Sequence, residues 1–137
     1  MPSFDEVKFD YTTVLNMDTM SMSTKILSKL LPDFSEAEMA KLVHDGYTGK
    51  FETDHLTPTV PVGEDFILEL FRGPTSAFKD VALSMLPRLM TASKEKLGVD
   101  DEIMILTATS GDTGKAAMEA SAMCRARRSS SSTPTAA

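Results

Sequence analysis

The chain has 137 residues, of which 42% are hydrophobic and 25% are charged, a composition typical of one small globular domain with an apolar core. Its 14 Lys and Arg residues against 20 Asp and Glu residues give a net charge of -6, which argues against a nucleic-acid-binding surface built from clustered cations. No apolar run approaches the roughly 20 residues needed to span a membrane, so a membrane partner is not expected.

Two short amphipathic helices are predicted in the first third of the chain. The segment TKILSKLL, residues 24–31, places four apolar side chains on one helical face, and Pro32 ends that pattern. A second helix opens with Ser35 and Glu38, which have the spacing of a capping box. Its apolar stripe continues to Gly46, where we expect the helix to stop.

The next predicted elements are a strand and a helix. Residues 66–71, FILELF, form an apolar run typical of a buried strand, which the Gly73-Pro74 pair breaks. A helix is predicted from Ser76, with apolar residues at three- and four-residue spacing. Pro87 lies inside this pattern and removes one helical hydrogen bond, which predicts a kink or an early end. Gly98 closes the segment.

A second strand and a second helix follow. Residues 103–106, IMIL, again favour a buried strand, and residues 111–114, GDTG, turn into the strong helix-forming sequence KAAMEA. The order strand, helix, strand, turn, helix is that of a βαβ unit. The sequence therefore predicts an α/β fold with a parallel sheet, preceded by short helices.

The loop TSGDTG follows the second predicted strand and opens the last helix. Ligands of open α/β sheets bind at the carboxyl ends of strands, where a helix N-terminus offers free N–H groups to an anion. Gly111 and Gly114 would let the backbone approach a ligand closely, and Ser110 and Thr113 would add hydroxyl groups. The alternative is that Asp112 or Thr113 simply caps the helix.

The loop ELFRGPTSAFKD follows the first predicted strand and places Lys79 at the start of the next helix. The positive end of a helix and partial desolvation both favour a neutral amine, the form that adds to carbonyl groups. Taken alone, Lys79 is better explained as a solvated helix residue. The two loops share one sheet edge, however, so an amine and an anion-binding turn are expected to lie together.

The two motifs LELFRGPTSAFKD and ILTATSGDTGKAA closely resemble those of threonine synthases, fold-type-II enzymes that use pyridoxal 5'-phosphate, and of the related threonine-synthase-like phospholyases. The match is specific over residues 66–120 and looser in the helices before it. It implies that residues 1–122 are the N-terminal portion of such a domain, with an incomplete parallel-sheet βαβ unit.

The resemblance also implies roles for individual residues. Lys79 is then the catalytic lysine, which bonds to the cofactor and moves protons between substrate carbons, and its two neighbours position it. The TSGDTG loop faces the cofactor ring and the substrate carboxylate, although Asp112 stands where many relatives have Asn. The cofactor-binding residues implied in this way are Phe78, Lys79, Asp80, Ser110, Gly111, Asp112, Thr113 and Gly114.

The reaction that the resemblance implies converts the small molecule O-phospho-L-homoserine and water into L-threonine and phosphate. One alternative is a phospholyase that only eliminates phosphate. Another is a non-catalytic fragment, because the glycine-rich loop for the cofactor phosphate and the hydroxyl partner of the pyridine nitrogen lie further along the family sequences. We therefore expect this chain to be inactive by itself.

Residues 123–137, MCRARRSSSSTPTAA, are basic and of low complexity, which predicts a disordered tail. One choice of synonymous codons for this tail, read one base out of frame after one added base, encodes DVPGTEIIVFYPNGG. That sequence contains an apolar strand, IIVFY, followed by a turn. We therefore hypothesise that the loss of one base near Ala120 produced the tail, and the alternative is a natural disordered extension.

The compartment follows from the cysteine count and the N-terminal sequence. Cys124 is the only cysteine, so no disulfide forms within one chain, and a reducing compartment is favoured. The opening residues MPSFDEVKFDYTT are acidic and lack the apolar region of a signal peptide. We expect a cytoplasmic protein. His44 and His55 are not at metal-ligand spacing, so no metal is expected.

Overall fold

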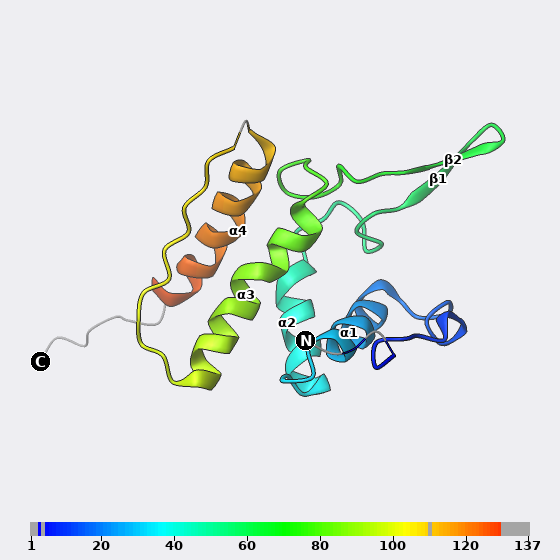
Figure 1. Cartoon of the computed structure of the whole chain (residues 1–137). Coiled ribbons are helices and arrows are strands. Elements are labelled where there is room, and N and C mark those ends of the chain that lie inside the picture. Colours follow the sequence, from blue (N-terminus) through cyan, green and yellow to red (C-terminus); the bar gives the residue numbers. More distant parts are fainter. Residues whose placement is uncertain (1–2, 4, 110, 130–137) are drawn as a thin grey trace, which may run out of the picture.

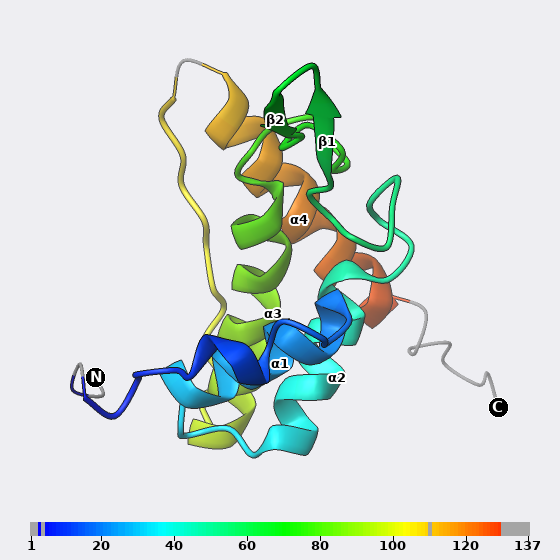
Figure 2. The same cartoon turned by 90° about the vertical axis from the view of Figure 1, so that its right-hand side faces the viewer.

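The computed structural model describes residues 3, 5–109 and 111–129. The described elements, in chain order, are the 3-10 helix η1 (Tyr11–Thr13), α1 (Thr19–Leu30), α2 (Glu36–Tyr47), β1 (Thr59–Val62), β2 (Asp65–Leu68), α3 (Asp80–Leu97) and α4 (Asp112–Ser129). Figure 1 shows α3 beside α4, α1 and α2 on the other side of α3, and the β1–β2 hairpin projecting from the helical body. The turned view in Figure 2 shows the extended segment after α3 running along the helices.

The two predicted N-terminal helices are confirmed, with changed bounds. The helix α1 begins at Thr19, earlier than predicted, because the Asp18 carboxylate caps it by accepting hydrogen bonds from the Met20 and Ser21 N–H groups at 3.0 Å. The capping box of Ser35 and Glu38 is present at the start of α2. These caps satisfy N–H groups that have no partner inside the helix.

The predicted stop at Gly46 is wrong, because α2 includes this residue and ends at Tyr47. Gly46 is buried, and a β-carbon on it would lie 2.4 Å from the Met85 sulfur. The glycine therefore serves close packing of α2 against α3. Met39 and Val43 on the same helix are completely buried and belong to the hydrophobic core.

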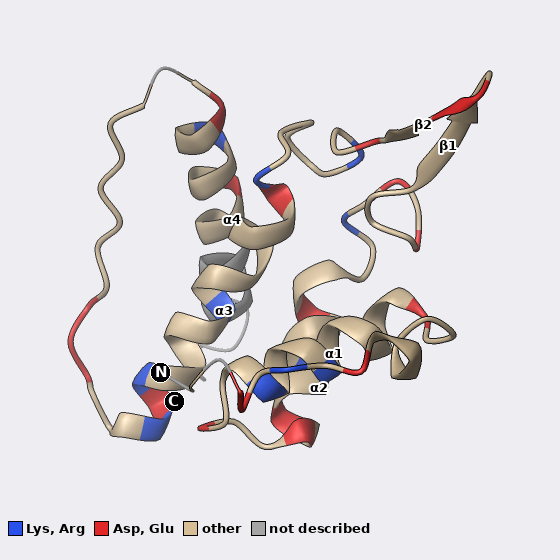
Figure 3. Ribbon diagram, turned by 45° about the vertical axis from the view of Figure 1, so that its right-hand side comes forward, with Lys and Arg blue, Asp and Glu red and all other residues tan. Residues whose placement is uncertain are grey.

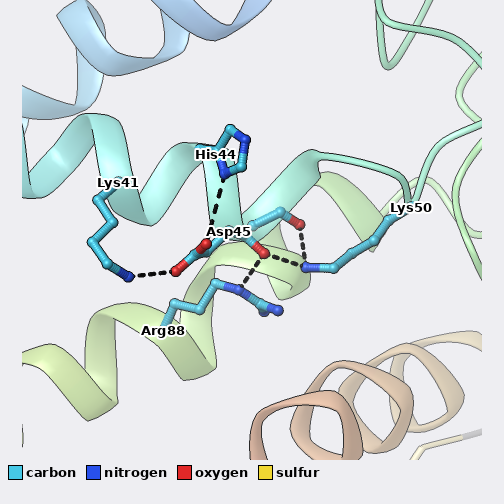
Figure 4. Close-up of polar contacts among 6 residues, drawn as sticks. Lys41, His44, Asp45, Lys50 and Arg88 are labelled. Atoms are coloured by element: carbon cyan, nitrogen blue, oxygen red, sulfur yellow. Dashed lines mark hydrogen bonds and ion pairs between the residues drawn. The ribbon is translucent and has the colours of Figure 1, made fainter. Parts of the chain in front are cut away.

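Polar contacts also fasten α3 to the end of α2 (Figure 4). The Arg88 side chain donates to the Asp45 carbonyl at 2.7 Å, and Lys50 donates to the carbonyls of Asp45 and Gly46 at 2.5 and 2.7 Å. The Asp45 carboxylate forms an ion pair with Lys41 at 2.7 Å. Cations thus satisfy carbonyl groups at the negative end of α2.

The strand prediction for residues 66–71 is confirmed over part of its length and wrong about burial. The strand β2 pairs antiparallel with β1 in a hairpin, and Phe66 is 74% exposed. The turn between the strands includes Gly63 in the left-handed region with φ of 64°. A hairpin forms from neighbouring residues, whereas a parallel pair needs a crossover and a partner strand.

The second predicted strand is not formed among the described residues. Residues 102–109 are extended but belong to neither helix nor strand, and residues 103–107 make no backbone hydrogen bond within the described part of the chain. The order of strand, helix, extended segment, turn and helix nevertheless follows the predicted α/β unit.

The helix predicted from Ser76 begins at Asp80 and runs to Leu97. Pro87 does not end it early, and its buried neighbours Met85 and Arg88 hold this part of α3 against α2. The prediction for Gly98 is confirmed, because this residue caps α3 in the left-handed conformation with φ of 62°.

The last predicted helix is confirmed as α4, whose backbone continues to Ser129. Residues 123–129 are thus helical, in contrast to the predicted disorder, and their Ala, Met and Arg content favours a helix. Residues 130–137 lie outside the described residues. The division of the chain at residues 122 and 123 stays a prediction.

Charges of both signs are scattered over the described elements, and Figure 3 shows acidic and basic residues interspersed on the ribbon. Within the described ranges, no helix has both the length and the apolar character required to cross a bilayer.

Candidate functional site

The loop before α3 is organised around the buried carboxylate of Asp80, the first residue of that helix. This carboxylate accepts hydrogen bonds from the Thr75 N–H at 2.8 Å and from the Thr75 hydroxyl at 2.6 Å. A β-carbon on Gly73 would lie 2.5 Å from the Asp80 side chain, so only glycine fits there. The contacts keep residues 75–79 in a loop and place Ser76 at φ of 58°, which explains why the helix does not begin at Ser76.

The start of the same loop is tied to a different part of the chain by Arg72. Its guanidinium donates to Glu69 at 2.8 Å and to Glu52 at 2.6 Å, and its carbonyl accepts from the Glu52 N–H at 3.0 Å. Hydrogen bonds from Arg72 to Glu52 and Glu69 raise the pKa of the guanidinium. The loop that carries Lys79 is therefore anchored at both ends.

Lys79 lies at the N-cap of α3, as predicted, and reaches the loop that opens α4. Its amine donates a hydrogen bond to the hydroxyl of Thr113 at 2.5 Å, across 34 residues of sequence. A second link runs the other way, because the amine of Lys115 donates to the Thr75 carbonyl at 3.3 Å. The predicted juxtaposition of the two loops is thus present.

The turn that opens α4 is held by Thr109. Its hydroxyl accepts hydrogen bonds from the N–H groups of Gly111 at 3.2 Å and Gly114 at 3.1 Å. Gly114 is buried, and a β-carbon on it would lie 3.0 Å from that hydroxyl oxygen. Gly111 has φ of 156° and open space around it, since a β-carbon there would meet no atom within 4 Å. Gly114 thus serves the packing of the turn, while the turn is open beside Gly111.

The other predicted site residues differ in how close they come to Lys79. Phe78 is 59% exposed, and its ring centroid lies 5.4 Å from the Lys79 amine. Asp112 is exposed at the start of α4. Ser110 lies outside the described residues.

Sequence reasoning missed four residues that build this site, namely Gly73, Thr75, Thr109 and Lys115. The threonines could have been found, because hydroxyl side chains commonly accept hydrogen bonds from nearby backbone groups in turns. Lys115 could not, since its contact joins residues 40 positions apart.

No family model matches the chain. Similar sequences exist nevertheless. The threonine synthase of Pseudomonas aeruginosa is 42% identical over 91 residues, which are 66% of this chain and 19% of that protein. The threonine synthase of Serratia marcescens is 33% identical over 122 residues, or 88% of this chain and 26% of that protein. The human threonine synthase-like 1 protein is 36% identical over 87 residues, or 63% of this chain and 11% of that protein.

Solved structures agree with the sequences. The PLP-bound threonine synthase of Brucella melitensis has 35% identity and a TM-score of 0.72, covering 80% of this chain and 24% of that one. Yeast threonine synthase has 29% identity and a TM-score of 0.74, covering 85% of this chain and 26% of that one. The chain thus spans about a quarter or less of the length of the relatives it matches. Sequence and fold together confirm the resemblance to threonine synthases and the α/β fold class, over a segment that makes up about a quarter or less of those enzymes.

Proposed function

We propose that this chain provides the lysine-bearing part of a pyridoxal 5'-phosphate site of the threonine synthase type, with Lys79 as the residue that bonds to the cofactor. The observation that carries the proposal is the contact between the Lys79 amine and the Thr113 hydroxyl. It brings the one amine at the start of α3 to the glycine-rich turn of α4. The PLP-bound relative from Brucella melitensis supports the choice of cofactor.

The groups at this place fit part of such a cofactor. A primary amine is what the aldehyde of pyridoxal 5'-phosphate requires, and the Thr113 hydroxyl beside it can exchange hydrogen bonds with ring oxygens. The turn is open beside Gly111, where a planar ring could approach the backbone. No group for the cofactor phosphate is assigned among the described residues.

When bound, the cofactor supplies an electron sink for the substrate carbon. Once the substrate amine has replaced it at the cofactor, the amine of Lys79 would be free to move protons between the α and β carbons of the substrate. The N–H groups of Asp112 and Thr113, the first two residues of α4, would bind the substrate carboxylate. Asp80 and Phe78 position the lysine, Asp80 through the Thr75 hydrogen bonds and Phe78 through its ring.

The reaction of the whole enzyme would convert O-phospho-L-homoserine and water into L-threonine and phosphate. Because this chain spans about a quarter or less of its relatives, we propose that the 137 residues alone do not catalyse it. The single cysteine of the sequence supports a cytoplasmic setting.

Reductive trapping tests the role of Lys79 without relying on turnover. The purified chain is incubated with pyridoxal 5'-phosphate and then with borohydride, which makes any bond between lysine and cofactor permanent. Peptide mass spectrometry should find the cofactor on the peptide that contains Lys79. Lys79→Arg, which keeps the positive charge, should lose the label, whereas Lys94→Arg in the last turn of the same helix should keep it. Equal labelling of all lysines, or none at Lys79, would refute the proposal and leave a non-catalytic fragment.

A threonine-synthase-like phospholyase is a second candidate, since the sequence motifs resemble those of both enzyme classes. The human protein named threonine synthase-like 1 is 36% identical, and yeast threonine synthase is 32% identical. The two reactions give different products from O-phospho-L-homoserine. A full-length protein that contains this segment should release threonine in the first case, and a 2-oxo acid with ammonia in the second.

A further inference from the structure

The β1–β2 hairpin exposes apolar side chains that the rest of the described chain does not cover. Figure 1 shows the hairpin projecting from the helical body, and neither of its strands packs against a helix among the described residues. On β2, Phe66, Ile67 and Leu68 are 74%, 48% and 53% exposed. An exposed apolar edge strand of this kind is a template for pairing with another strand.

The hydrogen bonding of the hairpin determines which backbone groups face outward. The Glu69 N–H donates to the Pro58 carbonyl at 2.9 Å, so these two residues form a hydrogen-bonded pair. Hydrogen-bonded and non-hydrogen-bonded pairs alternate along two antiparallel strands. The register therefore gives two pairs whose backbone N–H and C=O groups point away from the hairpin, namely Thr59 with Leu68 and Pro61 with Phe66.

The two outer edges of the hairpin are not equivalent. Pro61 has no N–H, and its ring occupies the outer edge of β1, so this edge cannot form a regular ladder. The outer edge of β2 keeps the N–H and C=O groups of both Phe66 and Leu68. No backbone group outside the hairpin pairs with them in the described part of the chain. The hairpin thus has one edge that is open to a further strand.

The strand β2 is complementary to a second copy of itself. With Ile67 on a two-fold axis, antiparallel pairing sets Phe66 of each copy opposite Leu68 of the other. This register uses every outward N–H and C=O group of the two residues, and it sets Ile67 directly opposite its equivalent. We propose that two copies of this chain associate in this way, so that their hairpins form one four-stranded antiparallel sheet.

Charge is compatible with this register, and the blocked edge limits the size of the assembly. Asp65 comes opposite Glu69 of the second copy, whose negative charge is balanced by the Arg72 guanidinium at 2.8 Å. Once the two β2 edges have paired, only the β1 edges with Pro61 remain outside. The two-fold contact is therefore closed, and it gives a dimer instead of a growing fibre.

The exposed apolar surface sets the expected strength of the dimer. The large apolar residues of 66–71 that are exposed are Phe66, Ile67, Leu68, Leu70 and Phe71. At roughly 200 Å² for a large side chain, their exposed parts amount to about 500 Å² per copy. Two copies then offer about 1,000 Å², the lower limit of a specific interface. We expect a dissociation constant in the micromolar range or weaker.

Sedimentation velocity of the purified chain, from micromolar to millimolar concentration, tests for the dimer. The mass should rise from that of one chain to that of two, and no further. Hydrogen exchange identifies the edge, because strand pairing protects N–H groups. The amides of Phe66 and Leu68 should exchange more slowly at high concentration, whereas the amide of Thr59 on the blocked edge should not change.

A charge exchange at Ile67 tests the two-fold register. Ile67→Lys and Ile67→Glu should each abolish the dimer, because like charges then lie directly opposite one another. A mixture of the two variants should restore it as a heterodimer, since the charges are then opposite. Loss of dimerisation through misfolding of the hairpin would not be reversed by mixing.

Thr59 and Leu68 give a matched pair of proline variants, because they face each other and neither N–H bonds across the hairpin. Leu68→Pro removes two hydrogen bonds from the dimer, which should raise the dissociation constant about tenfold or more. Thr59→Pro should change it less than about twofold. Hydrogen exchange of the Val60 and Ile67 amides, which do bond across the hairpin, checks that both variants keep it.

Three outcomes would overturn the proposal. They are equal effects of the two proline variants, a mixture of the Ile67 variants that stays monomeric, and a chain that is monomeric at every concentration. The last result would leave another part of a longer protein as the segment that covers β2. None of these experiments uses the cofactor, so a failure here is distinct from a failure of the role proposed for Lys79.

Discussion

Removing the Asp80 carboxylate is the sharpest test of how the Lys79 loop is held. Asp80→Ala deletes two hydrogen bonds that a 3% exposed carboxylate accepts from Thr75. A hydrogen bond to a charged group contributes about 1.5–3 kcal/mol, and the Thr75 N–H loses its partner when the carboxylate is gone. Because the two bonds share one side chain and are not additive, we expect a loss of about 3 kcal/mol in the free energy of unfolding.

The assay is urea unfolding of the chain, followed by the circular dichroism of the helices. Asp112→Ala is a matched control, because Asp112 also begins an 18-residue helix but is exposed. It should cost about 0.3–1 kcal/mol, the usual value of an acidic residue at a helix N-terminus.

A double-mutant cycle isolates the contact itself. Thr75→Val removes the hydroxyl, and combining it with Asp80→Ala should cost less than the sum of the single changes by about 1 kcal/mol or more. A loss of stability below about 1 kcal/mol for Asp80→Ala, or strict additivity with Thr75→Val, would refute the reasoning.

Three further predictions concern the helices. The hydrogen bond from Lys96 is the chief reason that the pKa of Glu38 is lowered from 4.5 to about 2. The ionised Glu38 carboxylate therefore stabilises the chain fully above pH 4.5, and this stabilisation is lost as the pH falls toward 2. Urea unfolding at several pH values should show that Glu38→Gln removes this dependence between pH 4.5 and 2. Burial raises the pKa of Tyr47 from 10.0 to about 12, so stability should fall between pH 10 and 12, and Tyr47→Phe should remove this dependence in the same assay. Gly46→Ala should lower the free energy of unfolding, measured in urea, by about 1 kcal/mol. Overpacking against Met85 costs about 1–3 kcal/mol, and the higher helix propensity of Ala offsets up to about 1 kcal/mol of this cost. A variant more stable than the original chain would show that Met85 moves aside freely.

The helices were predictable because their determinants are local. The capping box of Ser35 and Glu38 lies within four residues, and Gly98 ends α3 by its own backbone conformation. The stop predicted at Gly46 failed for a non-local reason, since the residue that requires a glycine there is Met85 on another helix.

The strands were less predictable because their partners lie elsewhere. An apolar run such as residues 66–71 suits a buried parallel strand and one arm of a hairpin equally well. The choice depends on which segment pairs with it, and Gly63 makes the local hairpin possible. Residues 103–106 have the composition of a strand, but nothing in their own sequence supplies a partner.

The sequence predicted that the Lys79 loop and the turn of α4 lie together, but it did not predict the residues that hold them in place. The meeting of Lys79 and Thr113 was expected from two loops at one edge of an α/β unit, and the structure has it. The parallel sheet on which that expectation rested is not formed in the described residues, whose strands β1 and β2 pair antiparallel. Something other than the sheet therefore brings the loops together, and the packing of α3 beside α4 with the Lys115 to Thr75 contact does so.

The loop of Lys79 and the turn that opens α4 can therefore form without the parallel sheet. The bonds from Thr75 to Asp80 and from Thr109 to Gly111 and Gly114 each close within five residues, so they form without the parallel strands. The extended segment, by contrast, gains its hydrogen bonds only when another strand arrives. Pairing of the extended segment with another strand should therefore rigidify residues 103–107 strongly while leaving the loop of Lys79 nearly unchanged. Hydrogen exchange that slowed equally in both places would mean that the lysine loop depends on the sheet after all.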